Sequence, residues 1–160
     1  MGDANRAIGF VVIVVLYLSI GIMAAAGCIA IGRRFLRPKL EQVFYGVFLM
    51  MIAAFYLAFT AYFQIGTAWR TESLAVLAFV VVGAAGARVP ALLTLGYAAH
   101  GVWDLLHELQ QHGACSTFAA GEVTTVPLAY GVFCAAFDLC VAVYAYLRRP
   151  EWSAAWRGSV

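Results

Sequence analysis

The residues best suited to chemistry stand together in one stretch, from His100 to Glu108. At about 100° of rotation per helical residue, His100, Asp104 and His107 would fall within an arc of about 60°. Trp103 and Glu108 would flank that arc. Two imidazoles and a carboxylate are therefore expected to project from one stripe of a single helix.

Three kinds of chemistry fit such a stripe. A histidine oriented by a carboxylate can move protons as a general acid or base. His100, Asp104 and His107 stand at positions i, i+4 and i+7, and could instead converge on a divalent metal. Asp138 would then be a further ligand. In the third case the groups form a proton relay, because intramembrane transporters use the same residue types.

The composition indicates that these groups belong to a membrane protein. Of the 160 residues, 64% are hydrophobic and 11% are charged, whereas a soluble domain carries about 25% charge. The net charge is only +2 and the basic residues flank apolar runs, which excludes a nucleic-acid-binding face. The four cysteines form no CxxC pair, so neither a disulfide nor a thiolate metal site is expected.

Five apolar segments predict five transmembrane helices in one domain, residues 1–160, because a backbone in lipid must satisfy its own hydrogen bonds. The first apolar run is longer than the core of a signal peptide, which is about 7–15 residues, so we expect it to remain as a span. The predicted spans are residues 8–31, 43–66, 73–87, 90–108 and 126–147.

The basic residues divide unequally between the two sides of this all-α bundle. Arg6 and Arg70 fall on one side. The other side holds Arg33, Arg34, Arg37, Lys39, Arg88, Arg148, Arg149 and Arg157. By the positive-inside rule, the N-terminus lies outside and the C-terminus lies in the cytoplasm. We therefore expect a multi-pass protein of the inner membrane.

Asp138 is expected at the same depth as His100. With a rise of about 1.5 Å per residue, His100 lies about 15 Å from Pro90, and Asp138 about 18 Å from Val126. Both depths fall near the centre of a hydrocarbon layer about 30 Å thick. A central aspartate costs about 2.5–3.5 kcal/mol to insert, so we expect it to have a partner and a function. Small residues share its helix face, and we expect that face to pack on the stripe.

Other polar and aromatic residues receive simpler interpretations. Trp103, Tyr56, Tyr130 and Glu108 are expected to contact a substrate beside the stripe. The paired tryptophans of the C-terminal tail, Trp152 and Trp156, are expected at the inner membrane interface. Two acidic residues at predicted helix ends are expected near water, namely Glu41 and Glu72.

The pattern His100-x-x-Trp103-Asp104-x-x-His107, followed by Pro127 and Cys134-x-x-x-Asp138, resembles a family of small bacterial membrane proteins of unknown function. The resemblance covers the last third of the chain. It implies one constellation that unites His100, Asp104, His107 and Asp138, and it supplies no activity. A weaker similarity, of architecture and residue type only, is to sterol-isomerase-like proteins and membrane terpene cyclases.

We therefore expect a small intramembrane enzyme that acts on an apolar lipid or isoprenoid-type substrate as an isomerase, cyclase or hydrolase. Asp104 or Asp138 would donate the proton, because apolar surroundings favour the neutral carboxyl. His100 and His107 would orient the acid or take the proton back. No cofactor is expected beyond the divalent metal of the alternative.

Two alternatives stay open. A transporter or metal-binding protein could use the same ladder of His and Asp side chains. An accessory subunit could carry these groups only to satisfy one another. The expected partners are membrane lipid and an apolar small molecule, and a homo-oligomer remains open.

Overall fold

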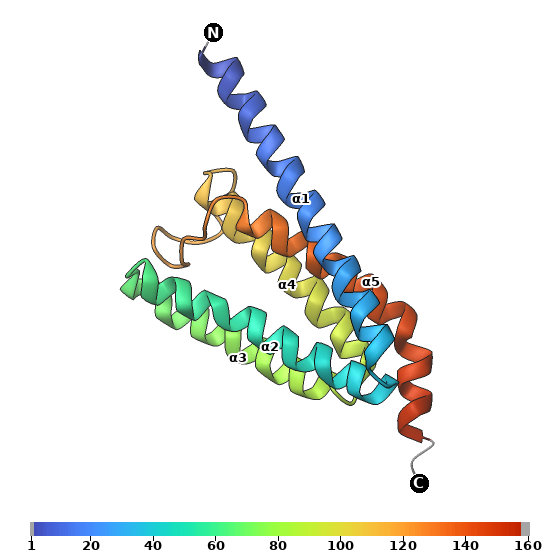
Figure 1. Cartoon of the computed structure of the whole chain (residues 1–160). Coiled ribbons are helices and arrows are strands. Elements are labelled where there is room, and N and C mark those ends of the chain that lie inside the picture. The colour runs from blue at the N-terminus through green and yellow to red at the C-terminus, as the bar shows by residue number, and fades with distance from the viewer. Residues whose placement is uncertain (1, 158–160) are drawn as a thin grey trace.

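The computed structural model describes residues 2–157, with side chains from residue 5 onward, and all regular secondary structure in this range is helical. The elements are α1 (Gly2–Phe35), α2 (Pro38–Tyr62), the 3-10 turn η1 (Gly66–Ala68), α3 (Trp69–Gly86), α4 (Pro90–Gln111) and α5 (Tyr130–Arg157). Successive helices run in opposite directions, so the two termini lie at opposite ends of the bundle (Figure 1). The prediction of an all-α fold is confirmed.

The connections between helices define two ends of the bundle. The α2–α3 connection and the long 112–129 segment lie at one end, which we call the loop end (Figure 1). The short 36–37 and 87–89 connections lie at the other, the C-terminal end. Pro38 and Pro90 begin α2 and α4, where a proline costs no helical hydrogen bond because the first N–H groups have no intrahelical partner.

Within the described residues, four helical segments are long and apolar enough to cross a membrane by length and composition. They are Asn5–Phe35, Pro38–Tyr62, Gly66–Gly86 and Tyr130–Arg157. The remaining helix, α4, has 22 residues and therefore a length of about 33 Å. Its polar stripe lowers its hydropathy, and that stripe is buried against its neighbours. The structure thus turns the costly groups inward, although composition alone leaves α4 unassigned.

Close backbone packing joins α4 to α5 beside the polar stripe. A Cβ atom on Gly131 would come within 2.5 Å of the Asp104 carbonyl oxygen and 2.8 Å of the Glu108 Cβ. A Cβ atom on Gly101 would meet the Ala135 carbonyl oxygen at 3.4 Å. The prediction that the small-residue face of the fifth segment packs on the stripe is confirmed.

The C-terminal part of α5 departs from the prediction. The helix continues through Pro150, and the Arg149 Nε–H donates to the Tyr146 carbonyl oxygen at 3.1 Å. Tyr146 is the acceptor that a proline at position 150 leaves without its backbone donor. Beyond this point the Trp152 and Trp156 indoles turn onto α2. An interfacial tail is therefore wrong for Trp152, which is fully buried.

Glu41 is the centre of this contact and is also fully buried, so its predicted place near water is wrong. Its carboxylate accepts the Trp152 indole N–H at 2.9 Å and an Arg148 N–H at 2.8 Å. The Tyr144 hydroxyl donates to the same carboxylate. Helical periodicity does not reveal that α5 returns over this end of α2, which is why Glu41 was expected near water.

Candidate functional site

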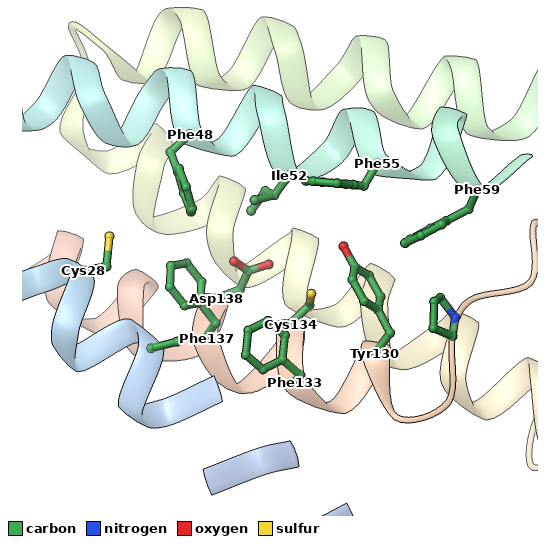
Figure 2. Close-up of a pocket in the computed structure, with 12 residues that line it drawn as sticks. Cys28, Phe48, Ile52, Phe55, Phe59, Tyr130, Phe133, Cys134, Phe137 and Asp138 are labelled. Atoms are coloured by element: carbon green, nitrogen blue, oxygen red, sulfur yellow. The ribbon is translucent and has the colours of Figure 1, made fainter. Parts of the chain in front are cut away.

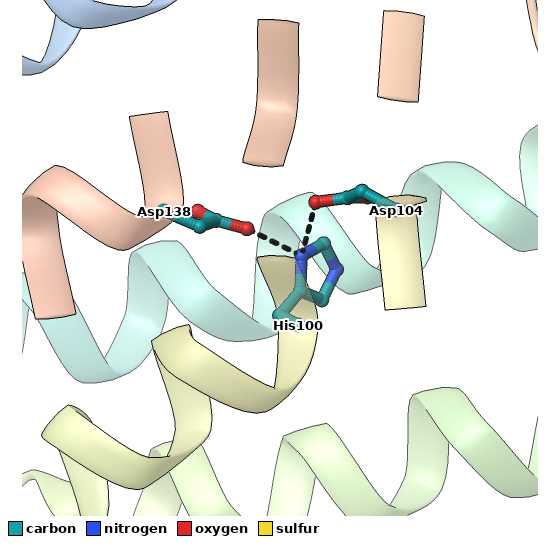
Figure 3. Close-up of side chains that lie close together, drawn as sticks. All are labelled: His100, Asp104 and Asp138. Atoms are coloured by element: carbon teal, nitrogen blue, oxygen red, sulfur yellow. Dashed lines mark hydrogen bonds and ion pairs between the residues drawn. The ribbon is translucent and has the colours of Figure 1, made fainter. Parts of the chain in front are cut away.

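His100, Asp104 and Asp138 lie together in the middle of the bundle (Figure 3). The Nδ1 atom of His100 is 2.6 Å from Asp138 Oδ2 and 3.2 Å from Asp104 Oδ2. All three residues are buried, at 0–1% exposure. One ring nitrogen of α4 therefore faces carboxylate oxygens from α4 and α5 at distances suited to proton transfer. We call these three residues the central cluster.

Tyr56 extends this cluster to α2. Its hydroxyl donates to Asp104 Oδ1 at 2.5 Å, and the tyrosine is 1% exposed. Its ring also packs on two imidazoles, with centroids 4.4 Å from His107 and 5.9 Å from His100. The structure places the hydroxyl of Tyr56, a predicted substrate contact, on the Asp104 carboxylate. Tyr56 can therefore fix the orientation of Asp104.

Three atoms of the central cluster are buried and have no hydrogen-bond partner among the described residues, namely Asp138 Oδ1, Asp104 Oδ2 and His100 Nε2. Of these, Asp104 Oδ2 still lies 3.2 Å from His100 Nδ1. Leaving such an atom unpaired costs about 1–3 kcal/mol, so most buried polar groups are satisfied. Among the described residues, Asp138 Oδ1 is therefore an unsatisfied buried polar atom.

A groove of about 660 Å³ runs beside Asp138, between α2 and the pair formed by α1 and α5 (Figure 2). Its lining is almost entirely apolar, with six aromatic rings: Ala24, Cys28, Phe48, Ile52, Phe55, Phe59, Pro127, Tyr130, Phe133, Cys134, Phe137 and Asp138. Phe55 is 49% exposed, so the groove reaches the surface of the bundle. Its volume is that of an ordinary small-molecule site, and Asp138 supplies the acidic side chain of its wall.

His107 lies apart from the central cluster. Its Nδ1–H donates to the Trp103 carbonyl oxygen at 2.9 Å, and its Nε2 is 2.9 Å from Glu72 Oε1. The Thr124 N–H donates to the same Glu72 oxygen at 2.8 Å. Glu72 is fully buried because the 112–129 segment folds over it, so its predicted place near water is wrong. Asp138, rather than His107, joins His100 and Asp104.

The remaining predicted site residues fall in different places. Glu108 accepts the Ala129 and Gly131 N–H groups at 3.1 and 3.0 Å, so it caps the start of α5. Tyr130 lines the groove (Figure 2). Trp103 packs its ring on His107, with centroids 5.0 Å apart.

From the sequence, the phenylalanines of the second segment are expected mostly to face lipid or to pack, with a minority that could line a hydrophobic pocket. The role of Glu72 was missed. The spacing of Phe48, Phe55 and Phe59 on α2 was visible, but lipid contact and groove lining give the same pattern. A usable signal existed for Glu72. A chain with only eight acidic residues seldom leaves a carboxylate beside a predicted span without a cationic or histidine partner.

The central cluster has the residue types of a metal site but not its spacing. Two carboxylates and one imidazole suit a divalent ion, and three ligand atoms lie within 4.8 Å of one another. Ligands at about 2.0–2.2 Å from an ion lie about 3 Å apart at a right angle. The 2.6 Å separation of His100 Nδ1 from Asp138 Oδ2 is shorter than that. The residue types fit a metal, whereas the spacing is that of a hydrogen bond.

A family described as "Family of unknown function (DUF6010)" matches residues 14–151, a range that includes the whole central cluster. Neither a curated protein nor a solved structure matches the chain. The match confirms the expected resemblance to a family of unknown function. It carries no activity, and it tests neither the His-Asp pattern nor the two architectural analogies.

Proposed function

We propose, for a chain that belongs to this family of unknown function, an intramembrane enzyme that uses Asp138 to protonate an apolar, lipid or isoprenoid-type substrate. The observation that carries the proposal is the position of Asp138. Its Oδ2 lies 2.6 Å from His100 Nδ1, its Oδ1 has no hydrogen-bond partner within residues 5–157, and its side chain lines an apolar groove (Figure 2). An acid at the wall of such a groove suits a substrate that is too apolar to dissolve in water.

The proposal places all five α-helices across the inner membrane, with the N-terminus outside. Burial of the polar stripe supports α4 as a span, because its neighbours shield the charged groups from lipid. Basic residues support the orientation, since Arg33, Lys39, Arg88 and Arg148 lie at the C-terminal end of the bundle. The groove then opens sideways into the bilayer.

The protonation state of the cluster follows from charge. Two carboxylates and a neutral imidazole would leave two negative charges in a buried site, at a cost of several kcal/mol for each ion. An added proton removes one of these charges. We place it on Asp138 Oδ1, because that oxygen has no hydrogen-bond partner among the described residues and belongs to the carboxyl group that lines the groove. This arrangement makes Asp138 the acid, while Asp104 stays ionised with the Tyr56 hydroxyl on it.

The reaction proposed is movement of a carbon–carbon double bond. Asp138 gives its proton to one alkene carbon, and the adjacent carbon becomes cationic. His100 Nδ1 stabilises the new carboxylate, and the ring faces of Phe48 and Phe137 stabilise the cation. Loss of a proton from a neighbouring C–H to Asp138 then forms the shifted alkene and restores the acid. Attack by a second double bond of the same molecule would give a ring instead.

The experiment uses purified full-length protein with a lipid extract of its host membrane in D2O. Mass spectrometry before and after incubation should show lipids that gain deuterium at carbon and elute as isomers. Wild type should produce them and Asp138→Asn should not. Leu139→Ala, which changes an exposed neighbour on the same helix and stays apolar, should behave as wild type. Equal labelling by wild type and Asp138→Asn would refute the proposal.

Metal binding is the second candidate, because His100, Asp104 and Asp138 are the described residues that could share one ion. Metal-dependent transport or catalysis would need His100 and Asp138 to separate beyond their present 2.6 Å. Elemental analysis of the purified protein decides between the two candidates. A stoichiometric divalent ion that is absent from Asp138→Asn protein would favour the metal, and deuterium-labelled isomers from metal-free protein would favour acid–base chemistry.

A further inference from the structure

We infer that the groove beside Asp138 binds a chain with an uncharged polar end, and that the Tyr130 hydroxyl holds this end. The inference rests on the proposed function and deepens it, because it names the class of substrate that Asp138 would protonate. That class is an unsaturated long-chain or prenyl alcohol, or a related carbonyl compound, rather than a hydrocarbon or a charged lipid. Three observations carry it: the polarity of the two walls, the length of the groove, and the charge of its lining.

The two long walls of the groove differ in polarity. The α2 wall is formed by apolar side chains, namely Phe48, Ile52, Phe55 and Phe59 (Figure 2). The α5 wall carries Tyr130, Cys134 and Asp138 at positions i, i+4 and i+8, so these side chains follow one another along one side of the helix. A bound chain with a polar atom is therefore expected to lie along α5, with that atom on this side.

Tyr130 presents its hydroxyl to the groove. It is the first residue of α5, and its hydroxyl points across the groove toward α2 (Figure 2). Its ring packs edge-on against Phe59, with centroids 4.9 Å apart, which fixes this direction. The Cys134 thiol is a hydrogen-bonding neighbour of the hydroxyl, and sulfur is both a weak donor and a weak acceptor. A ligand oxygen is a stronger acceptor, so the Tyr130 hydroxyl can donate to the ligand instead.

The depth of Tyr130 in the bilayer suits the polar end of a lipid. Tyr130 and Asp138 are separated by about 12 Å along α5, at a rise of about 1.5 Å per residue. Asp138 is predicted near the centre of the hydrocarbon layer, whose half-thickness is about 15 Å. Tyr130 would then lie near the edge of that layer at the loop end. An amphiphile in the bilayer keeps its polar end at this edge, so it already has the orientation that the groove requires.

Aromatic pairs between α2 and α5 mark both ends of the groove. Phe59 meets Tyr130 at the loop end, with centroids 4.9 Å apart. Phe48 meets Phe137 beside Asp138, with centroids 5.6 Å apart. The space between these pairs holds a segment of chain about as long as the 12 Å between Tyr130 and Asp138. A ligand held at Tyr130 therefore brings a double bond from the middle of its chain to Asp138.

The lining of the groove disfavours a charged polar end. The described residues that form it include no Lys, Arg or His, so no side chain of the lining could neutralise a phosphate or a carboxylate. An anion held at Tyr130 would also share the groove with the Asp138 carboxyl. Burying an unpaired charge costs far more than burying a hydroxyl that has a hydrogen bond. The polar end is therefore a neutral hydroxyl or carbonyl oxygen.

The first test measures binding and needs no turnover. Purified full-length protein is immobilised in detergent micelles that hold stearyl alcohol and octadecane at equal mole fractions, and mass spectrometry measures how much of each is retained. Neither probe has a double bond for Asp138 to protonate. The background is retention by Ile52→Trp protein, in which an indole fills part of the groove.

After this correction, wild type should retain the alcohol about three- to tenfold more than octadecane, the factor expected for one net hydrogen bond. Tyr130→Phe should lower this ratio to about one and leave the retention of octadecane unchanged. Tyr146→Phe is the matched control, because Tyr146 lies on the same helix and is 53% exposed. Its variant should keep the wild-type ratio. An unchanged ratio in Tyr130→Phe protein would overturn the inference.

Two further probes use wild type alone, so they test the inference even if Tyr130→Phe fails to fold. Octadecanethiol has sulfur in place of oxygen, and it should be retained no better than octadecane because sulfur is a weak acceptor. Stearyl phosphate should be retained less than stearyl alcohol, because no cation lines the groove. Retention of the thiol equal to that of the alcohol, or a preference for the phosphate, would overturn the inference.

The second test measures the spacing and separates the inference from the proposed function. In D2O, wild type should label oleyl alcohol, whose double bond lies mid-chain, about a hundredfold faster than an isomer with its double bond several carbons nearer the hydroxyl. Misplacing the reacting atoms costs about that factor. Equal labelling of the two isomers would overturn the spacing. Tyr130-dependent retention of stearyl alcohol without labelling of either isomer would refute the proposed function and support the binding site.

Discussion

The Tyr56 hydroxyl and the Asp104 carboxylate join α2 to α4 across the interior of the bundle, with 2.5 Å between donor and acceptor oxygens. Both side chains are almost completely buried. The bond therefore contributes both to the stability of the fold and to the orientation of the candidate acid–base cluster. In a variant that lacks the hydroxyl, the first contribution is measured by unfolding and the second by turnover.

Replacing Tyr56 with phenylalanine should lower the free energy of unfolding by about 1–3 kcal/mol, because a buried carboxylate oxygen loses its donor. Activity should fall without vanishing, since Asp138 keeps its contact with His100. Thermal unfolding in detergent and turnover of the labelled lipid measure the two effects. Tyr62→Phe is the control, because Tyr62 is 78% exposed and its variant should match wild type. A stable and fully active Tyr56→Phe protein would contradict the assigned role.

Replacing Asp138 or Asp104 with asparagine should abolish activity while the protein stays folded in the membrane. The amide keeps the size and most hydrogen bonds but cannot transfer a proton at neutral pH. Removal of a buried charge or acid also lowers the cost of insertion. Activity, metal content and thermal stability should be measured on the same preparations. Full activity in both variants would defeat the acid–base interpretation, and a parallel loss of bound metal would replace it.

Replacing Gly131 with alanine should destabilise the contact between α4 and α5. The new Cβ atom would lie 2.5 Å from the Asp104 carbonyl oxygen, so the helices must separate. Overpacking of this kind costs about 1–3 kcal/mol. Gly27→Ala is the matched control, because a Cβ atom there meets nothing within 4 Å. Equal melting temperatures for the two variants would show that the α4–α5 contact has room for the added methyl group.

Replacing Trp152 with phenylalanine should weaken the hold of the C-terminal turns on α2. The indole N–H donates to buried Glu41 at 2.9 Å, and its loss removes about 1–3 kcal/mol. Protease cleavage between Pro150 and Arg157 should become faster, while turnover by the distant central cluster stays unchanged. If Trp152→Phe protein resists protease as well as wild type does, another contact stabilises this segment, for example the Trp156–Gln42 hydrogen bond.

The proposed topology has its own test. A reporter fused to the C-terminus should be active in the cytoplasm, because the basic residues gather at that end of the bundle. A reporter inserted in the 112–129 segment should be active only outside. Cytoplasmic activity of both reporters would show that α4 and α5 do not cross the membrane as an antiparallel pair.

Helical geometry was enough to predict that His100, Asp104 and Asp138 meet. Two of these residues lie one turn apart on a single helix, and the third stands at the same depth on the next long segment. The depth of each residue in the membrane and the helix face that carries it therefore constrained its predicted position. The expected packing of the small-residue face of α5 on α4 completed the juxtaposition.

The partners of His107 and Glu41 could not be predicted in the same way. Glu72 lies 35 residues before His107, and Trp152 lies 111 residues after Glu41. Periodicity tells which face of a helix carries a residue, but not which helix packs on that face. Pro150 added to the difficulty, because a proline usually ends a helix, whereas here Arg149 supplies the missing donor to Tyr146.

The sideways opening of the groove beside Phe55 changes how affinity must be expressed. With the helices in a bilayer as proposed, an apolar ligand reaches the groove by lateral diffusion among lipids rather than from water. Its effective concentration is then its mole fraction in the membrane. Diluting the vesicles with buffer should leave occupancy unchanged, whereas adding inert lipid at constant total ligand should lower it. A bulk-phase KM for this protein would therefore describe the amount of lipid in the assay as much as the site itself.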